Sequence, residues 1–161
     1  MPQLSQRATG AAAIDAGDGP ALIFDIGGGS TELVLVDSHC DGAPRIVDWV
    51  SAPWGVVSLT ESAGGGDGDG AVGLASAYER MCNLVRESFA PFAARLPKVE
   101  GPRRLLGTSG TVTTLASVHL ELDRYDRAQV DGLIAPAASM RAMISSSGTC
   151  SAAELTRACV S

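Results

Sequence analysis

The stretch FDIGGGSTELVLVD, residues 24–37, constrains this chain more than any other part of the sequence. Two apolar runs flank three consecutive glycines and a serine, and one aspartate stands near the end of the first run. The runs predict two antiparallel strands, Ala21–Ile26 and Thr31–Asp37, with the nearly continuous apolar content of strands covered on both faces. A hairpin turn needs only two special residues, and each glycine costs conformational entropy. The extra glycines therefore predict that another group approaches the backbone closely at this turn.

The remaining elements alternate between strands and helices. Arg45–Ser51 and Arg103–Leu106 predict two further strands, whereas the stretch PWGVVSLTE, residues 53–61, favours no assignment. Apolar residues at three- and four-residue steps predict a long helix over Ala71–Leu96, kinked or ended early by Pro91. Its stripe, expected to pack in the core, is Leu74, Tyr78, Met81, Val85, Phe89 and Phe92. Shorter helices are expected at Val112–Leu120, Pro136–Ser146 and Ser151–Val160. The order β-β-β-α-β-α with C-terminal helices predicts an α/β fold with a mixed sheet.

Composition excludes several classes of function. A length of 161 residues fits one domain-sized unit, and residues 1–19 read as a tail or joint before it. The net charge of −6 argues against general nucleic-acid binding, which needs a basic face. No apolar run is long enough for a membrane helix and no signal pattern opens the chain, so we expect a cytoplasmic protein without a membrane partner. The four cysteines form no C-x-x-C pair and are expected to be reduced thiols. The Gly/Asp-rich segment at 63–70 predicts a surface loop, since it lacks the spacing of a calcium loop.

A second small-residue stretch, GTSGT at residues 107–111, also follows an apolar strand and opens a predicted helix. Exposed amides at such a turn, with the positive end of a helix dipole, can bind an anion without cationic side chains. Asp25 is the hard carboxylate suited to Mg²⁺ or Mn²⁺. Each stretch alone could equally be a plain turn, or a helix cap made by Ser109 or Thr111. Neither is a P-loop, because no lysine follows the glycines, and the first is followed by a strand, unlike a dinucleotide fingerprint.

Taken together, FDIGGGSTELV and LLGTSGTVTTLASVHLELDRYDRAQVDG resemble the exopolyphosphatase / guanosine pentaphosphate phosphohydrolase family. This family belongs to the actin and sugar kinase superfamily, whose two ribonuclease-H-like domains clamp a phosphate ligand between them. The resemblance spans roughly residues 19–147 and includes PWGVVSLTE. It implies that residues 20–161 form part of the second ribonuclease-H-like domain.

The resemblance also implies roles for individual residues. Asp25 would be the metal-side carboxylate, and Glu32, in the same motif, is either a second catalytic carboxylate or a paired structural acid. The phosphate-binding residues would be Gly27, Gly28, Gly29, Ser30, Thr31, Gly107, Thr108, Ser109, Gly110 and Thr111. Asp126, Arg127 and Asp131, in the matching segment RYDRAQVDG, favour a hydrogen-bonded structural turn over a substrate role.

The sequence departs from the family pattern because it resembles only part of a family member. Family members open with a whole first domain that carries another phosphate-binding hairpin and the glutamate that activates water, and nothing here corresponds to either. The resemblance thus implies a metal-dependent phosphohydrolase half, acting on polyphosphate or guanosine pentaphosphate with Mg²⁺ or Mn²⁺, and inactive without its N-terminal domain. Alternatives are a non-catalytic phosphate- or nucleotide-binding module, or an actin- or sugar-kinase-like ATPase domain. An incomplete sheet would leave an open strand edge that invites self-association.

Overall fold

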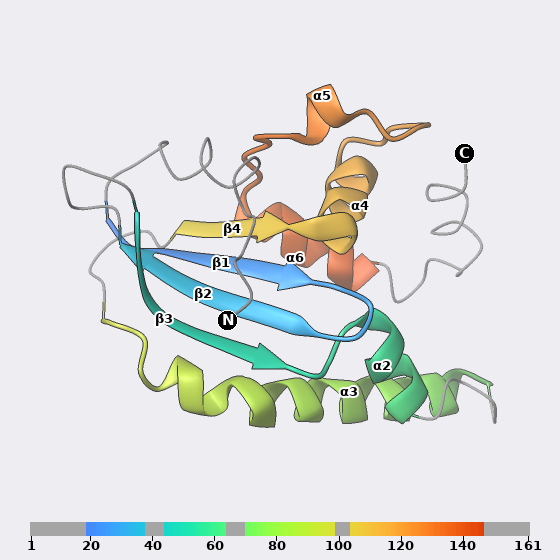
Figure 1. Ribbon diagram of the computed structural model, residues 1–161. Coiled ribbons are helices and arrows are strands. Elements are labelled where there is room, and N and C mark those ends of the chain that lie inside the picture. Colours follow the sequence, from blue (N-terminus) through green and yellow to red (C-terminus); the bar gives the residue numbers. More distant parts are fainter. Residues whose placement is uncertain (1–18, 38–43, 64–69, 99–103, 147–161) are drawn as a thin grey trace.

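The computed structural model describes residues 19–37, 44–63, 70–98 and 104–146 (Figure 1). Its strands are β1 (Ala21–Ile26), β2 (Thr31–Asp37), β3 (Arg45–Ala52) and β4 (Arg104–Thr108). Its helices are α2 (Val56–Ser62), α3 (Gly70–Ala93), α4 (Ser109–His119), α5 (Arg127–Val130) and α6 (Ala137–Ser146). The predicted N-terminal joint (except its last residue), most of the Gly/Asp-rich loop and the helix at Ser151–Val160 lie outside these ranges. None of the helices within them has the length and apolar character needed to cross a membrane.

The four strands form one mixed sheet in the order β3-β2-β1-β4. β2 pairs antiparallel with both β1 and β3, whereas β1 and β4 are parallel. Parallel neighbours need a long crossover, which α3 provides between β3 and β4. The predicted α/β class and β-β-β-α-β-α order are therefore confirmed, with α2 as an additional helix. Because β1 and β4 point the same way, their carboxyl ends meet at one edge of the sheet (Figure 1).

The two faces of the sheet differ in what covers them. Residues alternate between faces along a strand, so Leu35 and Ala52, both buried, share the face that α3 and α4 cover. On this face Asp48 pairs with Arg95, just beyond α3, at 2.9 Å. The opposite face, turned to the viewer in Figure 1, carries no helix of the described residues, and Trp49 on it is 64% exposed. Ala21 and Val36 share this face and are buried, so the expectation of strands covered on both faces holds at one end of β1 and β2 but fails around Trp49.

The long helix is present, but its predicted core stripe is only half right. Phe92 is the largest fully buried side chain, whereas Leu74 and Tyr78 are 61% and 58% exposed. The buried face is turned toward Ala77 and Phe92, because α3 packs against β3 and α2 along that side. The amino-terminal part of the apolar stripe therefore lies at the surface.

Two predicted boundaries also change. The helix runs two residues past Pro91 to Ala93, so the proline does not end it early. GTSGT is not a separate loop, since Gly107 and Thr108 complete β4 and Ser109 opens α4. Parallel pairing with β1 extends through Asp25 and Thr108, which keeps these small residues in the strand.

We predict that Phe92→Ala lowers the free energy of unfolding by about 3–5 kcal/mol, because it leaves a cavity under α3. Leu74→Ala is the matched control on the same helix, and we expect it to change stability by less than about 1 kcal/mol because the side chain is exposed. Urea denaturation followed by circular dichroism measures both. Equal losses for the two variants would contradict this assignment of the buried face.

Candidate functional site

The glycine turn between β1 and β2 is closed by a hydrogen bond from the Gly27 amide to the Ser30 carbonyl at 3.0 Å. Its glycines do not use left-handed φ angles, which the described glycines adopt only at Gly19 and Gly132. A requirement for positive φ therefore does not explain the three glycines.

Close approach of the chain explains Gly55, but not the turn glycines themselves: a Cβ at Gly27 or Gly28 would make only ordinary contacts, 3.4 Å from the Ser30 oxygen and 3.6 Å from Val57 Cγ2. The first turn of α2 lies directly against the glycine turn: the Val56 amide donates to the Gly27 carbonyl at 3.0 Å, and the Val57 amide to the Gly28 carbonyl at 2.9 Å. A Cβ at Gly55 would lie 2.4 Å from the Gly27 oxygen, so a side chain there is sterically excluded. The close approach expected from the sequence is thus made by the unassigned segment 53–61, through a helix too short to show a periodic pattern.

The second small-residue stretch is fastened to the first. The Ser109 hydroxyl donates to the Ile26 carbonyl at 2.9 Å, and the Thr111 hydroxyl donates to the same oxygen at 2.7 Å. Neither hydroxyl caps α4, whose N-cap residue Thr108 also makes no capping bond with its side chain. Ser109 has a φ of 77°, unusual for a residue other than glycine, in a segment held by this contact. The two stretches therefore lie side by side at the carboxyl ends of β1 and β4.

The carboxylates predicted to be catalytic are direct cross-strand neighbours. Asp25 pairs with Glu32 on β2 and with Thr108 on β4, so these three side chains start from the same face of the sheet. Opposed residues have Cβ atoms about 5 Å apart, and like charges in this position repel. The Ser51 hydroxyl donates to Glu32 Oε1 at 2.8 Å and holds that carboxylate. Glu32 is thus both hydrogen-bonded, as a structural acid would be, and adjacent to the proposed metal-side residue.

Several of the predicted phosphate-binding residues have their side chains engaged elsewhere. The Thr31 hydroxyl donates to the Trp54 carbonyl at 2.7 Å from the opposite face, and Ser109 and Thr111 are bound to Ile26. The hydroxyls of Ser30 and Thr108 make no hydrogen bond within the described residues. The structure therefore brings all ten positions together at one edge, but leaves few of the expected hydroxyl donors available.

The glycines separate into two groups by what surrounds them. A Cβ at Gly107 would lie 2.5 Å from Val112 Cγ1 and 2.8 Å from Phe24 Cζ, so this glycine allows β4 to pack against its neighbours. A Cβ at Gly29 or Gly110 would meet no atom within 4 Å. These two glycines border open space and leave room for a ligand.

The segment RYDRAQVDG is a hydrogen-bonded turn, as its sequence favoured. Asp126 caps α5 by accepting from the Ala128 amide at 2.9 Å, and it also accepts from Gln129 Nε2 at 2.8 Å. These bonds, that from Gln129 first, hold the Asp126 pKa below its usual value. Arg127 pairs with Asp131 at 2.8 Å, which raises the Arg127 pKa. The charged side chains of Asp126, Arg127 and Asp131 are therefore all engaged in contacts within the turn.

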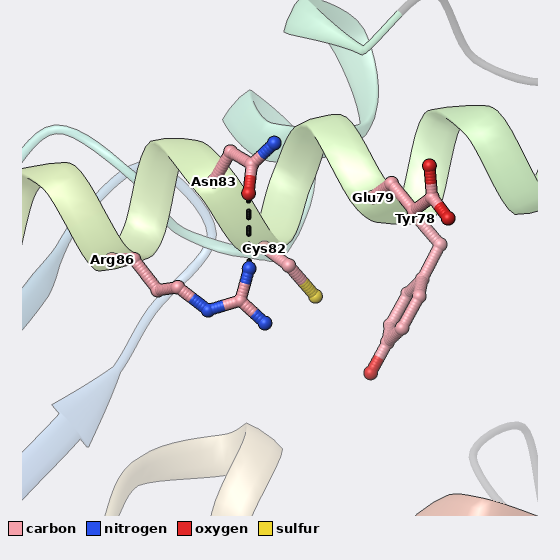
Figure 2. Close-up of a pocket in the computed structure, with 5 residues that line it drawn as sticks. All are labelled: Tyr78, Glu79, Cys82, Asn83 and Arg86. Carbon is pink, nitrogen blue, oxygen red and sulfur yellow. Dashed lines mark hydrogen bonds between the residues drawn. The ribbon is translucent and has the colours of Figure 1, made fainter.

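Two surface hollows of the described residues lie away from this edge of the sheet. One, of about 320 Å³, lies along α3 and is lined by Tyr78, Glu79, Cys82, Asn83 and Arg86 of that helix (Figure 2). A second, of about 370 Å³, adjoins it toward Leu59 of α2. A hydrogen bond with the Cys82 thiol is the main reason that the Tyr78 pKa is raised. Neither hollow is lined by a residue of the two small-residue stretches, so any ligand there would be separate from the predicted site.

Among the described residues, no three His, Cys, Asp or Glu side chains lie close enough together to hold a metal ion by protein ligands alone. Magnesium, however, is commonly held by one or two carboxylates and completed by water and phosphate oxygens. Asp25 and Glu32, on one face and in direct cross-strand register, fit that pattern. The donor set is therefore compatible with a metal that binds together with a phosphate compound.

Backbone amides at a small-residue turn and at a helix N-terminus are typical elements of anion-binding sites. Residues 6–150 match the Ppx/GppA phosphatase family, and the chain belongs to that family. It is 35% identical over 111 residues to exopolyphosphatase 2 of Mycobacterium tuberculosis (strains H37Rv and CDC 1551), a match that covers 69% of this chain and 31% of that protein. The chain thus spans about a third of the curated relatives' length.

Solved structures agree with the fold. The Aquifex aeolicus PPX-GPPA enzyme superposes with a TM-score of 0.68 at 22% identity, covering 91% of this chain and 44% of that one. An exopolyphosphatase-like protein of known crystal structure superposes with a TM-score of 0.67 at 26% identity, covering 95% and 45%. The aligned part of this chain therefore corresponds to less than half of each of these chains.

We predict opposite outcomes for two neighbouring glycines. Gly107→Ala should destabilise the fold by about 1–3 kcal/mol, because the new methyl overlaps Val112 and Phe24. Gly110→Ala, in the first turn of α4, should leave stability unchanged or raise it by up to about 1 kcal/mol, because alanine favours the helix and meets open space. Thermal unfolding monitored by circular dichroism compares them. A loss at Gly110 as large as that at Gly107 would refute the division of the glycines into two groups.

Proposed function

We propose that this chain is the phosphate-binding half of a metal-dependent phosphohydrolase acting on inorganic polyphosphate or guanosine pentaphosphate. Residues 20–161 would form part of the second of two ribonuclease-H-like domains. The observation that carries the proposal is the attachment of Ser109 and Thr111 to the Ile26 carbonyl, which holds two small-residue stretches at one edge beside Asp25. Membership of the Ppx/GppA phosphatase family supports the reaction class.

Asp25 and Glu32 would hold Mg²⁺ or Mn²⁺ together with phosphate oxygens. The metal would neutralise charge on the phosphate groups and thereby favour attack on the terminal phosphorus. The chain's own residues supply backbone donors from the glycine turn and from the first turn of α4, aligned with the helix dipole. Gly29 and Gly110 leave the space through which phosphate oxygens could reach those amides.

The overall reaction would be hydrolysis of the terminal phosphoanhydride bond. Water attacks the terminal phosphorus, the bond to the bridging oxygen breaks, and phosphate and a chain shortened by one unit are released. The proton of the water must pass to a general base, which in the resembling family is a glutamate of the first domain. We therefore propose that the 161-residue chain binds phosphate compounds but turns over negligibly alone.

We predict that the chain binds tripolyphosphate in the presence of Mg²⁺, and that Asp25→Asn removes the Mg²⁺ dependence and weakens binding at least tenfold. Asp48→Asn is the matched control, because it makes the same charge change on the opposite face of the sheet. Isothermal titration calorimetry with and without Mg²⁺ measures both variants. Similar losses for Asp48→Asn and Asp25→Asn would contradict the proposed site.

Phosphate release tests the catalytic part of the proposal. With long-chain polyphosphate and Mg²⁺, we expect release by the isolated chain to be indistinguishable from background. Turnover near that of a two-domain relative would refute the need for the first domain. Binding of ATP with no response to polyphosphate would instead favour a kinase- or actin-like ATPase domain.

A further inference from the structure

We propose that Ser58 and the first turn of α2 are the device that orients the amides of the glycine turn toward a bound phosphate group. This inference rests on the proposed function and names residues that act through the turn rather than on the ligand.

Consecutive carbonyls of the glycine turn are bound from one side by α2. The Gly27 carbonyl accepts from the Val56 amide at 3.0 Å. The Gly28 carbonyl accepts from the amides of Val57 at 2.9 Å and Ser58 at 3.2 Å. The Ser58 hydroxyl lies 3.2 Å from the Gly29 carbonyl, so the first turn of α2 contacts all three glycine oxygens.

The direction of the carbonyls fixes the direction of the next amides. In a trans peptide the C=O of one residue and the N–H of the next point in opposite directions, and the described chain has no cis bond. With the Gly27, Gly28 and Gly29 oxygens turned toward α2, the amides of the following residues point away from it. Those amides, of Gly28, Gly29 and Ser30, donate no hydrogen bond within the described residues. Successive amides on one side of a turn form a concave anion site.

Ser58 is the side chain that ties this arrangement together. Its Oγ accepts from the Gly55 amide at 2.8 Å, which fixes the start of α2. Its single hydroxyl hydrogen is within reach of the carbonyls of Gly29 and Pro53, both at 3.2 Å, and of Gly55 at 3.4 Å. One hydroxyl thus links the beginning of α2 to the last glycine of the turn.

Gly55 makes the contact possible. A Cβ there would lie 2.4 Å from the Gly27 oxygen and 2.5 Å from the Gly28 carbon and oxygen, which are backbone atoms that cannot move aside cheaply. Any side chain at this position would push α2 off the turn and free the carbonyls. Gly55 and Ser58 are therefore needed for the contact between α2 and the glycine turn, whereas a helix in general needs neither residue.

The test compares Ser58→Ala with Thr60→Ala. The Thr60 hydroxyl belongs to the same helix and donates only to the Val56 carbonyl, at 2.7 Å. Affinity for tripolyphosphate with Mg²⁺ is measured by calorimetry, and stability by thermal unfolding. We expect Ser58→Ala to weaken binding about fivefold, the effect of one hydrogen bond, and to lower the melting temperature modestly, because the bonds of this hydroxyl are internal to the fold. Thr60→Ala should bind within twofold of the parent chain, and Ser58→Thr should restore binding because it keeps the hydroxyl.

A second readout does not depend on phosphate. Amide hydrogen exchange followed by NMR reports whether Val56 and Val57 stay bound to the glycine carbonyls. We expect Ser58→Ala to speed their exchange severalfold and to shift the amide resonances of Gly28, Gly29 and Ser30, whereas Thr60→Ala should do neither. Unchanged exchange and resonances in Ser58→Ala would overturn the inference. If the parent chain bound no tripolyphosphate, the proposed function would fail, and exchange alone would decide the role of Ser58.

Discussion

The parallel pairing of β1 with β4 is the constraint on which the rest of this structure depends. It requires a long crossover, which α3 supplies, and it brings the carboxyl ends of both strands to one edge. Only then can the hydroxyls of Ser109 and Thr111 reach the Ile26 carbonyl and satisfy both of its lone pairs. Segments more than 80 residues apart in the sequence are thereby fixed side by side.

The small residues at this edge serve two different physical purposes. Gly55 and Gly107 permit close packing of the chain on itself, since a methyl at either would overlap neighbouring atoms. Gly29 and Gly110 face open space and have no packing reason to lack a side chain. An excess of glycine in a sequence can therefore signal internal contact, external access or both, and here both occur within one site.

The sequence predicted the strands well because their apolar runs and flanking turn residues are local signals. It did not predict α2, whose seven residues are too few for a periodic pattern and whose helix is held by tertiary bonds to glycine carbonyls. The prediction that the amino-terminal part of the α3 stripe is buried was wrong. Apolar residues at helical spacing indicate which face of a helix is apolar, but not how much of that face a neighbouring element covers. The cross-strand pairing of Asp25 with Glu32, and the destinations of the Thr31, Ser109 and Thr111 hydroxyls, depend on register and long-range contact and cannot be read from spacing alone.

The charge at the proposed site would make the binding of metal and the binding of phosphate interdependent. Asp25 and Glu32 face the same side in direct register, and the whole chain carries a net charge of −6. Neutral amides can donate hydrogen bonds to a phosphate, but they cannot cancel its charge or that of two carboxylates. A divalent cation between them would relieve the repulsion within the carboxylate pair and the repulsion between that pair and the anion. Because such coupling is reciprocal, phosphate should raise the affinity for the cation by the same factor as the cation raises that for phosphate.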